Sequence, residues 1–149
     1  AGRLRWAGGL LILAGLFDFF DGSLARLSGQ ETAFGAFLDS VIDRYSDLLI
    51  LLGILFFFIR GGRTGEILLT MATLVGTIMV SYTKARAQTI GVACEVGLME
   101  RPERLLCLIA GALSELLTPA LWVLAVLVNI TALQRIFFAR RVASSQRLR

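Results

Sequence analysis

The five aspartates of this chain all fall within residues 18–47, although the surrounding sequence is strongly apolar. Asp18 and Asp21 are three residues apart, and Asp39 and Asp43 are four apart, so each pair shares one face of a helix. A short connection makes the two helices antiparallel neighbours, which brings the acidic pairs to the same level. Carboxylates held this close repel one another and are poorly solvated unless cations neutralise them. The spacing therefore predicts a site for Mg²⁺ or Mn²⁺, which both accept carboxylate oxygens.

Small residues and one arginine lie between the two acidic pairs. Gly22 has no side chain, so a ligand can approach the backbone beside Asp21, and Ala25 keeps the same face open. Arg26 offers a fixed cation with forked donors, which suits a phosphate. Gly35 lies one turn before the second acidic pair, where it either leaves space above a cation or serves helix packing.

Asp47 extends the helix face that carries Asp39 and Asp43. Because Arg44 is close to it in the sequence, two interpretations stay open for this residue. Asp47 either belongs to the cation site or is an ion-paired residue of the helix.

The composition is that of a membrane protein. Of the 149 residues, 56% are hydrophobic and 17% are charged, whereas about 25% charged residues is typical of soluble domains. The apolar residues are spread along the whole chain, so several spans are expected rather than one. The chain contains no histidine, which excludes histidine-based nucleophiles and bases and most zinc chemistry.

Five helical segments are predicted, each near the length of about 20 residues that crosses a bilayer. They are residues 5–24, residues 32–59, residues 65–89, residues 101–117 and a fifth segment that follows Thr118-Pro119 and ends near residue 141. The expected fold is all-α, a polytopic bundle of transmembrane helices that forms a single domain over residues 1–149.

Basic residues alternate between the two ends of the predicted spans. Ten of them gather after the first, third and fifth segments, namely Arg26, Lys84, Arg86, Arg101, Arg104, Arg135, Arg140, Arg141, Arg147 and Arg149. The opposite ends carry four, namely Arg3, Arg5, Arg60 and Arg63. The positive-inside bias therefore places the aspartates at the cytoplasmic side of the cell membrane.

A second polar cluster follows from the stretches SYTKARAQ, residues 81–88, and MERPERLL, residues 99–106. Ser81 and Lys84 share a helix face, and Arg135 lies near the cytoplasmic end of the last segment. Together with Arg104, these cations predict a binding site for a phosphate group on a substrate. Anchoring to anionic lipid headgroups is the alternative, and it stays open for Arg101 as well.

The acidic stretch as a whole resembles the signature of the CDP-alcohol phosphatidyltransferase family. All eight signature positions occur at the family's spacing, Asp18-x2-Asp21-Gly22-x2-Ala25-Arg26-x8-Gly35-x3-Asp39-x3-Asp43. A chance match at a given start is on the order of 10⁻¹⁰ at ordinary residue frequencies. The resemblance implies six transmembrane helices around a cavity open to the cytoplasm, commonly in a homodimer. This chain is similar to helices two to six, so the domain is expected to lack the first.

The resemblance also implies a reaction and a role for each signature residue. The family transfers a substituted phosphate from a CDP-linked donor to an alcohol and releases CMP. Two divalent ions, Mg²⁺ or Mn²⁺, are implied at Asp18, Asp21, Asp39 and Asp43, with Asp43 also the general base. The residues implied to bind the CDP donor are Asp18, Asp21, Gly22, Ala25, Arg26, Gly35 and Asp39.

The basic stretches are similar to the prokaryotic phosphatidylinositol phosphate synthase branch of that family. This similarity implies CDP-diacylglycerol as donor, inositol phosphate as acceptor and the bilayer as surroundings, with no nucleic acid as partner. The acceptor phosphate would then contact Ser81, Lys84, Arg104 and Arg135. Gln88 stands where that branch often has an acid, so glycerol phosphate stays open as the acceptor.

Two other classes of protein fit the sequence less well. A divalent-cation transporter predicts acids in the middle of its spans and a polar route to both faces. Here the acids crowd one end, and residues 48–59 are continuously apolar. A structural scaffold gives no reason for Gly22, Ala25 and Gly35 at their spacing. The sequence therefore favours the transferase.

Overall fold

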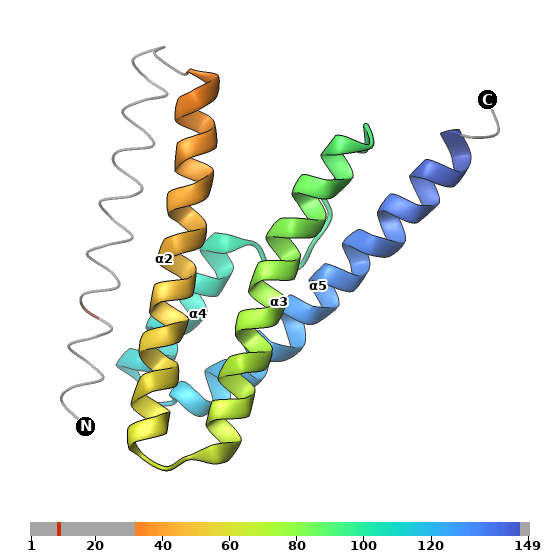
Figure 1. The fold of residues 1–149 in the computed structure, drawn as a ribbon. Coiled ribbons are helices and arrows are strands. Elements are labelled where there is room, and N and C mark those ends of the chain that lie inside the picture. Colours follow the sequence, from red (N-terminus) through yellow and green to blue (C-terminus); the bar gives the residue numbers. More distant parts are fainter. Residues whose placement is uncertain (1–8, 10–31, 147–149) are drawn as a thin grey trace.

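The structure, a computed structural model, describes residues 9 and 32–146, and all regular structure within residues 32–146 is helical (Figure 1). The elements are α2 (Ala33–Arg60), α3 (Thr64–Thr89), α4 (Arg101–Leu113) and α5 (Leu117–Gln146). The all-α prediction is confirmed for this part of the chain. Apart from residue 9, the predicted helix over residues 5–24 lies outside the described residues.

Local sequence signals set the bounds of α2 and α3. The Thr32 hydroxyl accepts a hydrogen bond from the Gly35 amide at 3.0 Å and so caps the start of α2. At the other end, Gly61 and Gly62 terminate the helix, and Gly62 takes a left-handed φ of 64° that favours glycine. α3 begins directly afterwards, so the two helices are antiparallel neighbours (Figure 1).

The predicted spanning helix over residues 101–117 is wrong in its length. α4 has 13 residues, which is a length of about 20 Å, whereas crossing the hydrocarbon layer takes about 30 Å. The helix ends because Ser114 caps it and Glu115 adopts a positive φ of 62°. α5 starts at Leu117 with Pro119 in its first turn and runs to Gln146, beyond the predicted end near residue 141.

Two of the described helices are long and apolar enough to cross a membrane, Thr64–Thr89 and Leu117–Ser145. Large apolar side chains on both are exposed, including Leu68, Met71 and Trp122. Exposed apolar side chains of this kind are favourable in contact with lipid and unfavourable in contact with water. α2 has 28 residues and is long enough to cross a membrane, but it carries four charged residues from Asp39 to Asp47.

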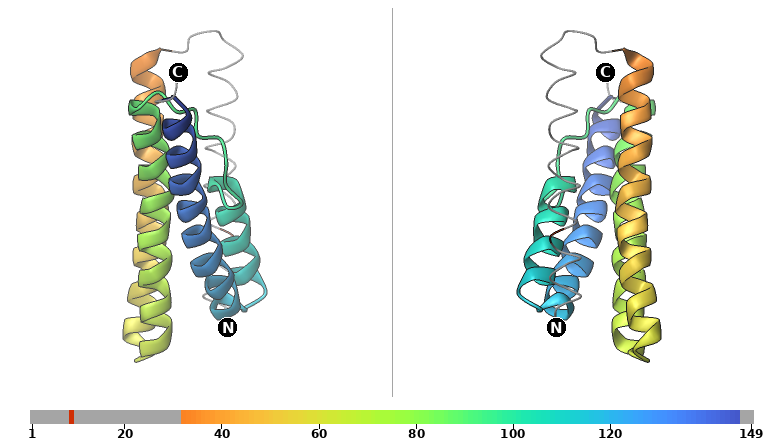
Figure 2. Two further views of the ribbon diagram at one scale, coloured as in Figure 1. Left: turned by 90° about the vertical axis from the view of Figure 1, so that its right-hand side faces the viewer. Right: turned by 90° about the vertical axis from the view of Figure 1, so that its left-hand side faces the viewer.

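The helices pack in a fixed order. α3 lies between α2 and α5, and the views from the side show α5 between α3 and α4 (Figure 2). A buried apolar cluster joins the four described helices, from Phe58 near the α2–α3 turn to Val80 and Met99 near the polar cavity described below. It also includes Leu51, Leu108, Leu121 and Leu124.

α3 and α5 approach each other closely at Gly76. A Cβ atom added there would lie 2.4 Å from Val128 Cγ2 and 2.8 Å from Asn129 Nδ2. The Asn129 amide also donates a hydrogen bond to the Ala72 carbonyl at 3.2 Å, which links the two helices. A small residue is therefore needed at this crossing, as is common between helices in membranes.

Replacing Gly76 with Val is expected to lower the free energy of unfolding by about 1–3 kcal/mol, because α3 and α5 must move apart. The measurement is SDS-induced unfolding of the purified protein in mild detergent. Gly53→Val is the matched control, since no atom lies within 4 Å of a Cβ placed at Gly53. Equal destabilisation by both substitutions would show that the helix crossing is not the cause.

Candidate active site

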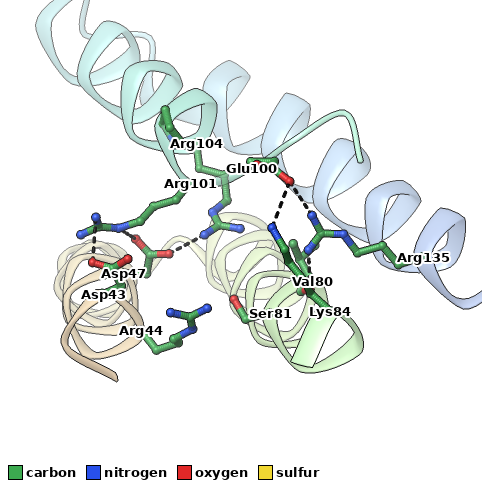
Figure 3. A pocket seen from close by; sticks show the side chains of 11 residues that line it. Asp43, Arg44, Asp47, Val80, Ser81, Lys84, Glu100, Arg101, Arg104 and Arg135 are labelled. Atoms are coloured by element: carbon green, nitrogen blue, oxygen red, sulfur yellow. Dashed lines mark hydrogen bonds and ion pairs between the residues drawn. The ribbon is translucent and has the colours of Figure 1, made fainter. Parts of the chain in front are cut away.

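Polar side chains from all four described helices surround a cavity of about 130 Å³ (Figure 3). Its lining residues are Asp43, Arg44, Asp47, Val80, Ser81, Lys84, Glu100, Arg101, Pro102, Arg104 and Arg135. Five of these are cations and three are carboxylates, so the lining carries a net charge of +2. A cavity with this balance favours an anionic ligand.

Arginines of α4 bridge to carboxylates of α2 across one side of the cavity. Arg101 Nη1 lies 2.8 Å from Asp43 Oδ1, and Arg101 Nε lies 3.7 Å from Asp47 Oδ1. Arg104 Nη2 donates to Asp47 Oδ2 at 2.5 Å. Because the backbones of α2 and α4 do not come into close contact, these long side chains connect the two helices (Figure 3).

This arrangement bears on the two interpretations of Asp47. Within the described residues Asp47 is ion-paired, although the partners are the arginines of α4 and not the sequence neighbour Arg44. Its side chain is 16% exposed and is shared by Arg101 and Arg104. A carboxylate held in this way fixes the position of the guanidinium groups that face it.

Arg104 is buried, and its side chain is only 7% exposed. Asp47 engages Nη2, but Nη1 has no hydrogen-bond partner among the described residues. A buried donor without an acceptor is unfavourable, so an oxygen atom of a ligand at this position would be stabilised. Arg104 is therefore prepared to bind an anion in the cavity.

Arg135 is fixed from three directions. Nε donates to the Val96 carbonyl, Nη1 to the Val80 carbonyl and Nη2 to Glu100 Oε1, each at 2.7 Å. Its side chain is 3% exposed. These bonds use three of the five N–H groups of the guanidinium and leave two for a ligand.

Glu100 connects Arg135 to the lysine of α3. Its Oε1 atom also lies 3.8 Å from Lys84 Nζ, so one carboxylate oxygen faces both cations (Figure 3). Glu100 is the residue before α4, but its side chain makes no capping hydrogen bond to that helix. The carboxylate is thus directed at the cations of the cavity.

The loop between α3 and α4 passes close to Arg135 at Gly97. This glycine has a φ of 152°, and an added Cβ would lie 2.7 Å from Thr131 Cγ2 and 3.2 Å from Arg135 Nη2. The Met99 amide donates to the Thr131 hydroxyl at 3.1 Å and holds the loop against α5. Any side chain at position 97 would therefore push the loop away from Arg135.

The structure brings together the predicted acceptor residues. Ser81, Lys84, Arg104 and Arg135 all line the cavity, and Asp43 lies at its edge. Sequence reasoning missed Glu100 and Gly97. Their only local signals were an acid directly before the Arg101-Pro102 pair and a glycine within the same loop.

The predicted cation site is described only in part. Asp39 is exposed on α2, one turn before the half-buried Asp43, and Gly35 is exposed in the first turn. Within residues 32–146 no group of three or more His, Cys, Asp or Glu side chains could hold a metal ion. The other predicted residues of the signature, Asp18, Asp21, Gly22, Ala25 and Arg26, lie outside the described residues.

Comparison with known sequences shows relatives along almost the whole chain. Residues 1–133 match the family described as CDP-alcohol phosphatidyltransferase. The chain is 40% identical over 144 residues to archaetidylinositol phosphate synthase of Methanothermobacter thermautotrophicus, covering 93% of this chain and 71% of the relative. It is 37% identical over 147 residues to phosphatidylinositol phosphate synthase of Mycobacteroides abscessus, covering 93% and 67%.

Two solved structures are similar to this chain in fold. The crystal structure of Mycobacterium tuberculosis phosphatidylinositol phosphate synthase with CDP-DAG bound superposes with a TM-score of 0.85 at 34% identity. That match covers 93% of this chain and 74% of the other. A crystal structure of the same enzyme in complex with manganese and citrate gives the same TM-score and covers 71% of that chain. The sequence match and the shared fold show that this chain belongs to the CDP-alcohol phosphatidyltransferase family of phospholipid-synthesising enzymes.

Proposed function

We propose that this enzyme transfers a phosphatidyl group from CDP-diacylglycerol to inositol phosphate and releases CMP. The observation that carries this proposal is the cationic wall of the cavity beside Asp43, in which the buried Arg104 keeps an unpartnered donor. The relatives named for phosphatidylinositol phosphate and archaetidylinositol phosphate synthesis support the choice of acceptor. The related structure with CDP-DAG supports the choice of donor.

Divalent cations are part of this proposal. Asp39 and Asp43 lie one turn apart on α2, and their carboxylate oxygens fit Mg²⁺ or Mn²⁺. Asp18 and Asp21 would complete a site for two ions, and a related structure contains manganese. Bound ions would neutralise the diphosphate of the donor and polarise the phosphorus atom under attack.

The signature residues would position the donor next to this acidic site. Arg26 is proposed to face the diphosphate, while Gly22, Ala25 and Gly35 leave room for the nucleotide. Asp18, Asp21 and Asp39 would hold the donor through the ions. Phosphoryl transfer depends mainly on such alignment and charge neutralisation.

Asp43 is proposed as the general base. Its carboxylate lies at the edge of the cavity on α2, where an acceptor hydroxyl can approach it. As the new bond between the acceptor oxygen and phosphorus forms, Asp43 takes the hydroxyl proton and the bond from phosphorus to CMP breaks. A single displacement of this kind needs no covalent intermediate on the protein.

The phosphate already present on the acceptor would bind at the opposite wall. Arg104 and Arg135 offer free guanidinium N–H groups there, and Lys84 adds a flexible ammonium. The Ser81 hydroxyl from the same face of α3 can donate one further hydrogen bond. Binding the phosphate here directs the polyol hydroxyls towards Asp43.

The surroundings proposed for the enzyme follow from its apolar helices and its basic loops. The spans of α3 and α5 support a multi-pass protein in the cell membrane. The basic residues near the polar half of the bundle support an active site that faces the cytoplasm. We further propose a homodimer, as the family resemblance implies.

The direct test is headgroup analysis with the full-length enzyme in detergent. CDP-diacylglycerol and Mg²⁺ or Mn²⁺ are supplied with inositol phosphate, glycerol phosphate or unphosphorylated inositol, and CMP and lipid products are measured. Inositol phosphate is expected to be incorporated, and chelation with EDTA is expected to stop the reaction until the metal is restored. Incorporation of glycerol phosphate instead would overturn the choice of acceptor, and transfer unaffected by EDTA would overturn the role of the metal.

A further inference from the structure

The carboxylate of Glu100 occupies a position that suits an oxygen of the substrate's phosphate. Its Oε1 atom is 2.7 Å from Arg135 Nη2 and 3.8 Å from Lys84 Nζ, two of the cations assigned above to that phosphate. We propose that Glu100 is an internal anion that takes the place of the acceptor phosphate in the empty site and must be displaced when the acceptor binds. This inference rests on the proposed function, because it assumes a phosphorylated acceptor.

Glu100 is not needed to hold Arg135 in place. The carbonyls of Val80 and Val96 already accept hydrogen bonds from Nη1 and Nε at 2.7 Å. Both are backbone groups, one in α3 and one in the loop, so the plane of the guanidinium is fixed without the carboxylate. Loss of Glu100 would therefore leave Arg135 positioned and one of its donors free.

Glu100 can also leave its position at little cost. Its side chain is 44% exposed, so water can solvate the released carboxylate, and its pair with Lys84, which is 38% exposed, is screened and contributes little. Arg135 is only 3% exposed, but it keeps the Val80 and Val96 carbonyls as acceptors when the carboxylate leaves. Because the Glu100 side chain does not cap α4, its rotation into solvent breaks no hydrogen bond of that helix.

Asp47 provides the contrast within the same cavity. Its side chain is 16% exposed and accepts a hydrogen bond of 2.5 Å from Arg104, which is itself buried. Removing this carboxylate would leave a buried guanidinium without its partner, which is strongly unfavourable. Asp47 is therefore a positioning residue, whereas Glu100 competes with the ligand.

Competition by Glu100 explains how the site can select a phosphate monoester. A monoester near neutral pH carries a charge of about −1.5 to −2 and three oxygens, whereas the carboxylate carries a single charge. The doubly charged group can displace Glu100, but singly charged anions gain less by doing so. Glu100 is thus a specificity-determining residue for a phosphorylated acceptor.

The test compares four variants of the full-length enzyme in detergent at constant ionic strength. They are Glu100→Gln, Glu100→Ala, Asp47→Asn and the matched control Glu103→Gln. Glu103 is exposed on α4 outside the cavity lining, so its variant makes the same change of charge near the site. The readouts are the KM for inositol phosphate at saturating CDP-diacylglycerol and the Kd for inorganic phosphate from thermal stabilisation, which requires no turnover.

The two Glu100 variants are expected to lower both constants on the order of fivefold. Asp47→Asn is expected to raise them by about tenfold or more, and Glu103→Gln to leave them unchanged. Higher or unchanged constants in both Glu100 variants would overturn the inference, as would an equal decrease in Glu103→Gln. If the wild-type enzyme incorporates no inositol phosphate but the Kd for phosphate decreases in the Glu100 variants, the proposed acceptor fails and the inference holds.

Discussion

Asp43→Asn is expected to lower kcat by at least about a hundredfold, because the amide cannot take the proton of the acceptor hydroxyl. The affinity for CDP-diacylglycerol is expected to stay within a few-fold of the wild-type value, since the other signature carboxylates remain. The side chain keeps its size and its place on α2 at the edge of the cavity. Single-turnover rates and equilibrium binding of the donor to full-length enzyme separate the two effects.

Tyr45→Phe is the matched control for this substitution. Tyr45 lies on the same helix, is exposed and does not line the cavity, so its variant reports any general disturbance of α2. Near-normal turnover by Asp43→Asn would remove its assignment as the base. A loss of donor affinity equal to the loss of turnover would instead show that Asp43 acts by holding the donor through metal.

Arg104→Ala is expected to raise the KM for inositol phosphate by about tenfold to a hundredfold, which is the range of a lost charged hydrogen bond. The KM for CDP-diacylglycerol is expected to stay unchanged, because Arg104 pairs with Asp47 and not with the signature residues described on α2. Arg104→Lys is expected to give an intermediate value, since it keeps the charge but loses the fork of donors. Steady-state kinetics with each substrate varied in turn provide the measurement.

Arg60→Ala is the control for a lost positive charge. Arg60 lies at the opposite end of α2, where its guanidinium contacts the ring of Phe56. It is expected to leave both KM values at the wild-type level. Parallel increases in the donor and acceptor KM of Arg104→Ala would place this arginine elsewhere in the reaction.

The helices that could be predicted well are those with local signals at their ends. Thr32 and the Gly61-Gly62 pair fixed α2 to within one residue at each end, because capping depends only on neighbouring positions. The end of α4 could not be predicted, since Leu113, Leu116 and Leu117 keep the helical spacing of apolar residues across the turn at Glu115. The hydrophobic period by itself does not reveal a turn of this kind.

Four cavity residues with a predicted role in binding the acceptor could be named from the sequence, but the pairing of charges within the cavity could not be predicted. Ser81, Lys84, Arg104 and Arg135 converge because the ends of their segments lie on one side of the bundle, which the charge pattern indicates. Which carboxylate meets which cation depends on the path of the loop over residues 90–100. That path is set by Gly97 and by contacts with α5 that are distant in sequence, and no periodic pattern records them.

The steric contacts and the ion pairs that join the helices respond differently to salt. α5 is fastened to α3 at Gly76 and to α4 at Gly111, where an added Cβ would lie 2.5 Å from Ala120 Cβ. The backbones of α2 and α4 do not come into close contact, and at the cavity the two helices are linked by arginine–carboxylate pairs. Steric contacts are insensitive to electrolyte, whereas charge pairs weaken as it is added. Substitutions in the ion pairs can therefore change the alignment of the reacting groups, while the glycine contacts of α5 keep the helices packed.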